Sequence, residues 1–371
     1  MTTLLRDPAA AHKHDADVAS RVAATVRDDI RAMHAYPVPK SDGLIKLDAM
    51  ENPFSLPAEV RARIAATVAN VAINRYPDAG ADAIKQALRH AFALPDGVEL
   101  VLGNGSDELI SMLTALVAKP GATIVAPEPS FVMYAISARL ANVRYVGVPL
   151  AADFALDVDA MLGAIARERP ALTWLAFPNN PTGNLFDPAS IEAIARASPG
   201  LVVIDEAYYA FANRSFLLRV HEFPNMVVVR TVSKIGMAAL RLGYAVGEPL
   251  WMRELDKVRP PYNVNALTPA VAPVLLEEEA LLAGQAQAIC DERERLALAI
   301  SALPGVRVWP THTNFVLARF ADANATFDDL RAAGILVKNM HGVHPSLANC
   351  LRSTVGTPEE NDALLQALTP K

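Results

Sequence analysis

The run Met226-Val-Val-Val-Arg-Thr-Val-Ser-Lys234 decides much of what can be inferred about this chain. Its apolar residues predict a buried strand that delivers a lysine into a Ser-Lys-Ile-Gly turn. Two earlier apolar runs end in polar residues in the same way: Leu201-Val-Val-Ile204 leads into Asp205-Glu-Ala-Tyr208, and Leu172-Thr-Trp-Leu-Ala-Phe177 leads into Pro178-Asn-Asn-Pro-Thr-Gly183. Because ligands of parallel sheets bind beyond the carboxyl ends of the strands, these polar residues are expected to share one site.

Strand-like and helical patterns alternate along the chain and predict an α/β fold. Between about Asp96 and Gly247, near-continuous apolar runs separated by helical patterns indicate a mainly parallel seven-stranded sheet with helices on both faces. The candidate strands are Val98–Leu102, Thr123–Ala126, Val143–Val148, Leu172–Phe177, Leu201–Ile204, Met226–Val229 and Leu242–Val246. Shorter strands follow and predict a smaller C-terminal α+β domain: Val306–Trp309, Asn314–Phe320, Ile335–Lys338 and Cys350–Val355.

The length of 371 residues exceeds what one core usually supports, so two domains are expected. The expected parts are an irregular N-terminal tail over 1–29, a segment over 30–57 that packs with the small domain, a large domain over 58–258 and a small domain over 259–371. The stretch Arg259-Pro-Pro-Tyr-Asn263 marks the junction. One long helix is expected from Val271 to Ala302, and Thr357-Pro-Glu-Glu360 predicts a capping box at the start of the last helix.

Composition excludes several classes of protein. The net charge is −6, and acidic and basic residues are interspersed, so neither a nucleic-acid face nor a polybasic membrane patch is indicated. Cys290 and Cys350 form no CxxC pair, and two reduced thiols are expected. No apolar run approaches the roughly 18 residues of a membrane span, and the N-terminus lacks the apolar core of a signal peptide. A cytoplasmic location is expected by default.

Lys234 and Asp205 together suit one cofactor, pyridoxal 5′-phosphate (PLP). A lysine can hold an aldehyde as a Schiff base, and an aspartate can keep a pyridine nitrogen protonated. Taken singly, each has a plainer interpretation, because a lysine after a strand is usually a solvated surface residue and an aspartate there is often structural. The three motifs in this order favour the cofactor. Glu206 should point away from the site, since side chains alternate along an extended backbone.

The order Asn-Asn-Pro-Thr-Gly, Asp-Glu-Ala-Tyr, Ser-Lys and then Arg241 resembles that of the fold type I PLP-dependent aminotransferases. Three further stretches are similar to the histidinol-phosphate aminotransferases of the class II subgroup: Asn74-Arg-Tyr-Pro-Asp78, Gly103-Asn-Gly-Ser-Asp107 and Cys350-Leu-Arg-Ser-Thr-Val-Gly-Thr357. The resemblance runs from about Ile30 to the C-terminus.

This resemblance implies catalytic roles for Lys234, Asp205 and Tyr208. Lys234 would bond to the cofactor and then move a proton at the substrate α-carbon, while Asp205 would pair with the pyridine nitrogen. Asn180 and Tyr208 would donate hydrogen bonds to the phenolic oxygen of the ring, although either could instead fix a loop. Phe131 occupies the place of the family's ring-stacking aromatic, and a core phenylalanine is the alternative.

A phosphate-binding cup is expected where Gly105, Ser106 and Asp107 open a helix. The N-terminal amides of this helix would face the phosphate, and Ser106 can cap it. Ser233 and Arg241 would add a hydroxyl and a bidentate cation. The lysine-to-arginine spacing is seven here, whereas many aminotransferases have eight.

The resemblance also implies residues that bind a partner subunit or a substrate. Tyr76 matches a residue that reaches the partner's cofactor phosphate, which implies a homodimer; an interface or turn tyrosine is the alternative. Arg352 matches the arginine that clamps the substrate carboxylate. Lys338 stands where relatives often carry an arginine for the substrate phosphate, which keeps the charge and loses the bidentate geometry. Tyr36 completes the expected substrate-binding set.

The predicted reaction is transamination between histidinol phosphate and 2-oxoglutarate, giving imidazole-acetol phosphate and glutamate in histidine biosynthesis. Three alternatives stay open: an aromatic amino-acid aminotransferase, a phospho-amino-acid decarboxylase of the same fold, and a ligand-sensing regulator. The short N-terminal tail and the intact Lys234 disfavour the regulator. His341 and His344 near Lys338 lack neighbouring carboxylates and cysteines, so no metal ion is expected.

Overall fold

The computed structural model describes residues 8–35 and 37–369, which fall into one part ahead of Ser41 and one from Ser41 onward. The first part contains α1 (Pro8–Thr25) and α2 (Asp28–Arg31). An alanine-rich sequence favours a helix, so α1 replaces the irregular tail expected over these positions. An ion pair one turn apart on α1, Arg21 to Asp17 at 2.9 Å, adds to that preference.

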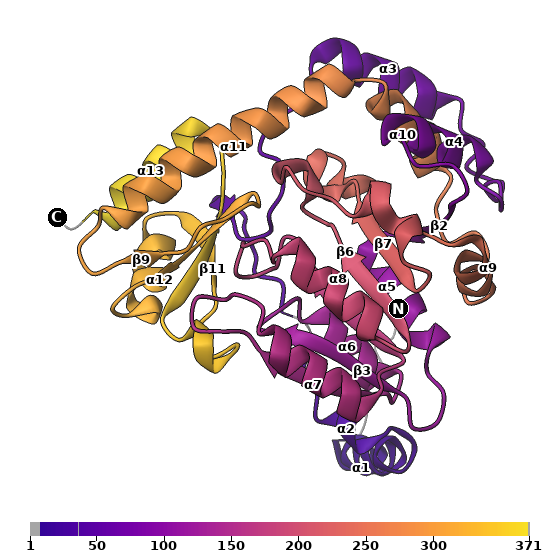
Figure 1. Cartoon of the computed structure of the whole chain (residues 1–371). Helices are drawn as coiled ribbons and strands as arrows, with labels where there is room; N and C mark the ends of the chain where they lie inside the picture. The colour runs from indigo at the N-terminus through magenta and orange to yellow at the C-terminus, as the bar shows by residue number, and fades with distance from the viewer. Residues whose placement is uncertain (1–7, 36, 370–371) are drawn as a thin grey trace. The chain divides into compact units, whose positions relative to one another are not determined.

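The second part is built around a seven-stranded sheet with the order β2-β8-β7-β6-β5-β3-β4 (Figure 1). Its strands are β2 (Glu99–Asn104), β3 (Thr123–Glu128), β4 (Arg144–Pro149), β5 (Leu172–Ala176), β6 (Leu201–Asp205), β7 (Met226–Thr231) and β8 (Leu242–Gly247). Only β8 runs antiparallel to its neighbours, β2 and β7. The predicted mainly parallel sheet is therefore confirmed, and the carboxyl ends of β2, β3, β5, β6 and β7 meet at one edge.

Helices cover both faces of this sheet. One face packs against α5 (Ser106–Leu116), α6 (Met133–Leu140) and α9 (Pro249–Lys257). The other face packs against α3 (Ala58–Ala69), α4 (Asp82–Ala91), α7 (Val158–Glu168), α8 (Pro188–Ala197) and α10 (Leu267–Leu276). Strand residues alternate between these cores: Val203 and Val227 face the first, and Val202 and Val228 face the second.

A five-stranded sheet follows, with the order β1-β11-β12-β10-β9. Its strands are β1 (Ile45–Leu47), β9 (Arg307–Val308), β10 (Phe315–Arg319), β11 (Ile335–Asn339) and β12 (Cys350–Thr354), and its helices are α11 (Glu279–Ser301), α12 (Ala323–Ala332) and α13 (Pro358–Leu368). Strand β1 pairs in parallel with β11, so the segment that precedes the large sheet in sequence joins the small one. Short 3-10 helices span Tyr209–Phe211, Leu217–Glu222, Ser233–Ile235, Ala238–Leu240 and Pro345–Leu347.

The predicted helix from Val271 to Ala302 is wrong as a single element. The structure divides it into α10 and α11, because Glu278 (φ −85°, ψ 45°) leaves the helical conformation. The start is also earlier than expected, since Asn265 Oδ1 accepts the N–H groups of Leu267 at 2.9 Å and Thr268 at 3.0 Å. The predicted capping box at Thr357 and Glu360 is confirmed. Within residues 8–35 and 37–369, no helix is long and apolar enough to cross a membrane.

Candidate active site

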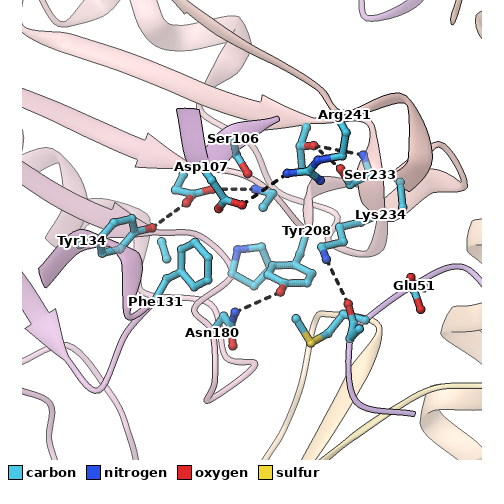
Figure 2. Close-up of a pocket in the computed structure, with 18 residues that line it drawn as sticks. Glu51, Ser106, Asp107, Phe131, Tyr134, Asn180, Tyr208, Ser233, Lys234 and Arg241 are labelled. Carbon is cyan, nitrogen blue, oxygen red and sulfur yellow. Dashed lines mark hydrogen bonds and ion pairs between the residues drawn. The ribbon is translucent and has the colours of Figure 1, made fainter. Parts of the chain in front are cut away.

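A cavity of about 210 Å³ opens at the carboxyl edge of the large sheet (Figure 2). Most of the residues predicted from the sequence to bind a cofactor line it: Ser106, Asp107, Phe131, Asn180, Asp205, Tyr208, Ser233, Lys234 and Arg241. They come from the ends of separate strands and are brought together by the parallel order of β2, β3, β5, β6 and β7. Three residues from the segment after β1, Ala49, Met50 and Glu51, close the opposite side.

Lys234 lies in the turn after β7, with its ammonium inside the cavity. Its Nζ donates to the carbonyl oxygen of Ala49 at 3.3 Å and lies 5.8 Å from the ring centre of Tyr208. Burial lowers the pKa of Lys234 to about 8, and the nearby cation of Arg352 acts in the same direction. A sizeable fraction of the amine is therefore neutral near physiological pH, which is the state that can attack a carbonyl carbon.

Asp205 is the last residue of β6 and is only 4% exposed. The Tyr134 hydroxyl donates to Asp205 Oδ2 at 2.7 Å, and the N–H of Ala207 donates to Oδ1 at 3.0 Å. Burial raises the pKa of the Asp205 carboxyl to about 6. Within the described ranges no cationic side chain forms a salt bridge with it, so a ligand cation could take that place.

Glu206 points away from the cavity, as its place on an extended strand predicts. Its carboxylate pairs with Arg230, accepting from Nη2 at 2.8 Å and from Nε at 2.9 Å, and it accepts from the Ser215 hydroxyl at 2.9 Å. Both charged side chains are buried on the far face of the sheet. The adjacent carboxylates therefore differ: Glu206 is neutralised by this chain, and Asp205 is not.

The residues expected to bind a phosphate meet at the start of α5, with one correction. Gly105, with φ +82°, is the N-cap residue, and Ser106 is already helical and makes no capping hydrogen bond. Glu108 Oε2 accepts the N–H of Asn104, the residue before the cap, at 2.6 Å, and among the described residues no side chain caps the helix itself. A Cβ at position 105 would lie 2.7 Å from Arg241 Nη2, so glycine lets the guanidinium approach the backbone.

Cationic and hydroxyl groups complete this cup. Arg241 Nη2 lies 3.5 Å from Asp107 Oδ2, and the Thr231 hydroxyl donates to Ser233 Oγ at 2.8 Å. Arg241 itself has φ +49°, a left-handed conformation that turns its side chain back towards α5 after the short helix Ala238–Leu240. The backbone amides of α5, the hydroxyls and the guanidinium thus converge on one corner of the cavity.

Arg352 connects the small sheet to the site. From β12 its Nη1 donates to Asn180 Oδ1 at 2.6 Å and its Nη2 donates to the Asp48 carbonyl at 3.1 Å. Asn180 Nδ2 in turn donates to the Tyr208 hydroxyl at 3.1 Å. Lys338 is the cross-strand partner of Arg352 on β11; burial and then the charge of Arg352 lower its pKa. Lys338 does not line the cavity itself.

Among the predicted site residues that the structure describes, Gly105, Tyr76, Lys338 and Arg352 do not line the cavity. Tyr76 is 80% exposed and stacks on Tyr262, with ring centres 4.5 Å apart. Tyr36 lies outside the described residues. His341 and His344 bond locally instead: His341 Nδ1 accepts the Asn349 N–H at 3.0 Å, and His344 Nδ1 lies 2.7 Å from Ser346 Oγ. Over the described ranges no group of three or more His, Cys, Asp or Glu side chains could hold a metal.

Tyr134 is the functional candidate that the sequence analysis missed. It lines the cavity and holds Asp205, yet in the sequence it is one apolar-looking position in the helix after Phe131. The available signal was its spacing of three residues from Phe131: the Tyr134 N–H bonds to the Phe131 carbonyl at 3.1 Å in the turn that opens α6, and both side chains pack in the same core.

The comparisons with known proteins agree with this geometry. Residues 42–368 match the model of the aminotransferase class I and II family, and the chain belongs to that family. Within it, the chain is 54% identical to histidinol-phosphate aminotransferase 2 of Cupriavidus pinatubonensis, over 92% of this chain and 95% of that protein. It is 53% identical to histidinol-phosphate aminotransferase of Chromobacterium violaceum, over 92% of this chain and 96% of that protein.

A solved structure shows the same fold with a ligand. The crystal structure of histidinol-phosphate aminotransferase from Sinorhizobium meliloti, in complex with pyridoxal-5′-phosphate, superposes with a TM-score of 0.83. It is 27% identical to this chain and covers 93% of this chain and 96% of its own. The predicted fold type I architecture is therefore confirmed.

Proposed function

We propose that this protein is a PLP-dependent aminotransferase that exchanges amino groups between histidinol phosphate and 2-oxoglutarate. The observation that carries the proposal is that the amine of Lys234 and the buried carboxylate of Asp205 line one cavity at the carboxyl edge of one sheet. Membership of the aminotransferase family supports the reaction class. Relatives at 53–54% identity that are named histidinol-phosphate aminotransferases support the substrate.

The donor set fits PLP at three separate points. Asp205 offers the pyridinium nitrogen a buried carboxylate that no cation of residues 8–35 and 37–369 pairs with, and Lys234 offers an amine inside the cavity for the aldehyde. The cup of α5 amides, Ser233 and Arg241 offers donors for the phosphate. When bound, PLP supplies an electron sink for negative charge at the substrate α-carbon. Phe131, from the loop before α6, would cover one face of the ring.

Lys234 would act first as the nucleophile that holds the cofactor and later as the group that carries a proton. Once substrate displaces it, Nζ is the only amine of this chain lining the cavity in the described ranges, and its pKa of about 8 lets it both accept and release a proton. Asn180 and Tyr208 would hold the phenolic oxygen, because their side chains already hydrogen-bond each other at the same wall.

Substrate recognition is proposed for the face that the small sheet presents. Arg352 would bind the carboxylate of glutamate or 2-oxoglutarate, since its guanidinium already reaches Asn180 at the cavity. Lys338 beside it would bind the phosphate of histidinol phosphate. An arrangement with two cations in neighbouring strands suits a dianion better than an aromatic side chain, which favours histidinol phosphate over phenylalanine.

A half-reaction assay tests the proposal. The purified protein loaded with PLP should convert to the aminated cofactor with histidinol phosphate much faster than with phenylalanine, and should not release carbon dioxide from threonine phosphate. Preference for phenylalanine would support the aromatic aminotransferase, and carbon dioxide release would support the decarboxylase. Either result would replace the proposed substrate.

We also propose a homodimer with shared sites, in which Tyr76 reaches the partner's cofactor phosphate. Large exposed apolar side chains support this: Ile73 and Tyr76 are each 80% exposed, Tyr262 and Leu267 are each 42% exposed, and Tyr76 stacks on Tyr262. We further propose a large domain over 58–258 and a small one over 259–371, with the β1 part of the segment 30–57 packing with the small domain; the two separate sheets support this division. A cytoplasmic location accords with the free thiols of Cys290 and Cys350.

A further inference from the structure

We infer that Tyr134 is a positioning residue that acts through Asp205. By donating a hydrogen bond to the Asp205 carboxylate, it would keep the proton that lies between this carboxylate and the cofactor's ring nitrogen on the nitrogen. The inference rests on the proposed function for the identity of the cofactor. It concerns a side chain that the reaction as described above does not use.

The geometry of Tyr134 favours this role over simple packing. Its side chain is fully buried, and its ring lies parallel to that of Trp174 with centres 4.6 Å apart and an interplanar angle of 4°. The ring of Phe131 lies perpendicular to it, with centres 5.8 Å apart. The ring alone would satisfy these contacts, as a phenylalanine would. The hydroxyl instead points out of the aromatic group and donates to Asp205 Oδ2 at 2.7 Å, at the floor of the cavity (Figure 2).

Tyr134 is the only side chain of the described residues that donates to the Asp205 carboxylate. The other donor is the backbone N–H of Ala207, which bonds to Oδ1. Burial raises the pKa of Asp205 to about 6, and the Tyr134 hydrogen bond acts against that rise. A donor on a carboxylate oxygen stabilises the charged form and so makes the carboxylate a weaker base.

A weaker base at this point has a direct consequence for the ring. A proton shared between a pyridine nitrogen and a carboxylate resides on the more basic partner. Without the Tyr134 donor, Asp205 becomes more basic and the proton moves towards its oxygen. The ring nitrogen then approaches the neutral state and becomes a poorer electron sink. A hydrogen bond to a charged group is worth about tenfold to a hundredfold in an equilibrium or rate.

The test uses Tyr134→Phe, with Tyr209→Phe as the matched control. Tyr209 is another tyrosine whose buried hydroxyl makes no hydrogen bond within the described residues. Each variant is loaded with PLP that carries ¹⁵N in the ring, and the ¹⁵N chemical shift reports protonation of the nitrogen without turnover. We expect the shift in Tyr134→Phe to move towards that of neutral pyridine, and kcat to fall about tenfold or more. Tyr209→Phe should match the parent in both.

A double-mutant comparison separates this role from a structural one. If Tyr134 acts through Asp205, then Tyr134→Phe should change neither the ¹⁵N shift nor the PLP dissociation constant in an Asp205→Asn background. An unchanged ring-nitrogen shift in folded Tyr134→Phe would overturn the inference, and so would equal effects in the two backgrounds. Failure of the proposed function is recognised separately, because the parent protein would then fail to bind PLP or to transaminate histidinol phosphate.

Discussion

Lys338→Ala is the change that separates a phosphate-binding role from a general one. Lys338 lies on β11 directly across from Arg352 on β12, so the two cations are neighbours on one sheet face. Burial, and after it the Arg352 charge, lower the pKa of Lys338, while Asp48 raises it. A doubly charged phosphate between the two cations would stabilise both of their charges, whereas a phenylalanine side chain would not.

The expected loss follows from removing one charge-assisted contact in a half-buried site. Such a contact is worth about 1.5–3 kcal/mol, which corresponds to a loss of about tenfold to a hundredfold in kcat/KM. The loss should appear with histidinol phosphate and be nearly absent with glutamate, which has no phosphate. Lys338→Arg should retain activity with histidinol phosphate, because a guanidinium keeps the charge and can bind a phosphate through two parallel hydrogen bonds.

Arg352→Ala supplies the contrasting arm of the assay. It should reduce kcat/KM most with glutamate, because histidinol phosphate carries no carboxylate, although the lost bond to Asn180 should affect both substrates. Steady-state kinetics of both variants on both substrates therefore give four values. Equal losses from Lys338→Ala on the phosphorylated and unphosphorylated substrates would refute its specific role, provided that circular dichroism shows an intact fold.

Three further changes test the cofactor site and the dimer. Lys234→Ala should remove the absorbance band of lysine-bound PLP and nearly all turnover while leaving the circular dichroism spectrum unchanged; persistence of that band would contradict the assignment. The pKa of Asp205 in the folded protein is about 6, above its ordinary value of 3.8, so its protonated form is favoured by folding and this contribution to stability is lost as pH rises through 6. Asp205→Asn, which has no charge to bury, should therefore stabilise the apoprotein at pH 7 by up to about 3 kcal/mol. The same change should weaken PLP binding. A lower melting temperature of the Asp205→Asn apoprotein would count against this reading. Heterodimers of a Tyr76→Ala subunit and a Lys234→Ala subunit should be more active than the mean of the two parent variants, because one of their two sites carries neither change. If the subunits exchange and activity does not rise, Tyr76 acts in the site of its own chain.

The large sheet and most of the cavity could be predicted because their signals are local. Apolar runs such as Leu201–Ile204 identify buried strands, and the parallel order places the residue after each run at one edge. The same reasoning separated Asp205 from Glu206 correctly, since alternation on a strand is a property of the backbone.

The features that the sequence could not provide depend on contacts between distant segments. Tyr134 reads as core material until the fold sets its hydroxyl against Asp205, 71 positions away. Ser106 is a residue type that often caps helices, but the left-handed Gly105 takes the N-cap position and Ser106 becomes the first helical residue. The break between α10 and α11 falls at the glutamates Glu277 and Glu278, which are good helix formers, while most buried apolar residues of the two helices lie in different cores.

The opposite shifts of Lys234 and Asp205 have one cause. Both side chains are withdrawn from water, and within the described ranges neither forms a salt bridge. Burial therefore disfavours the ammonium form of Lys234 and the carboxylate form of Asp205. A pyridinium cation beside Asp205, and a carbonyl carbon bonded to the Lys234 amine, would relieve both penalties together, so cofactor binding should stabilise the folded protein. Glu206, the residue after Asp205, forms a buried ion pair with Arg230, and the two charges neutralise each other. Removing either one leaves a buried charge alone and should destabilise the protein, whereas neutralising Asp205 should stabilise the apoprotein and abolish its function.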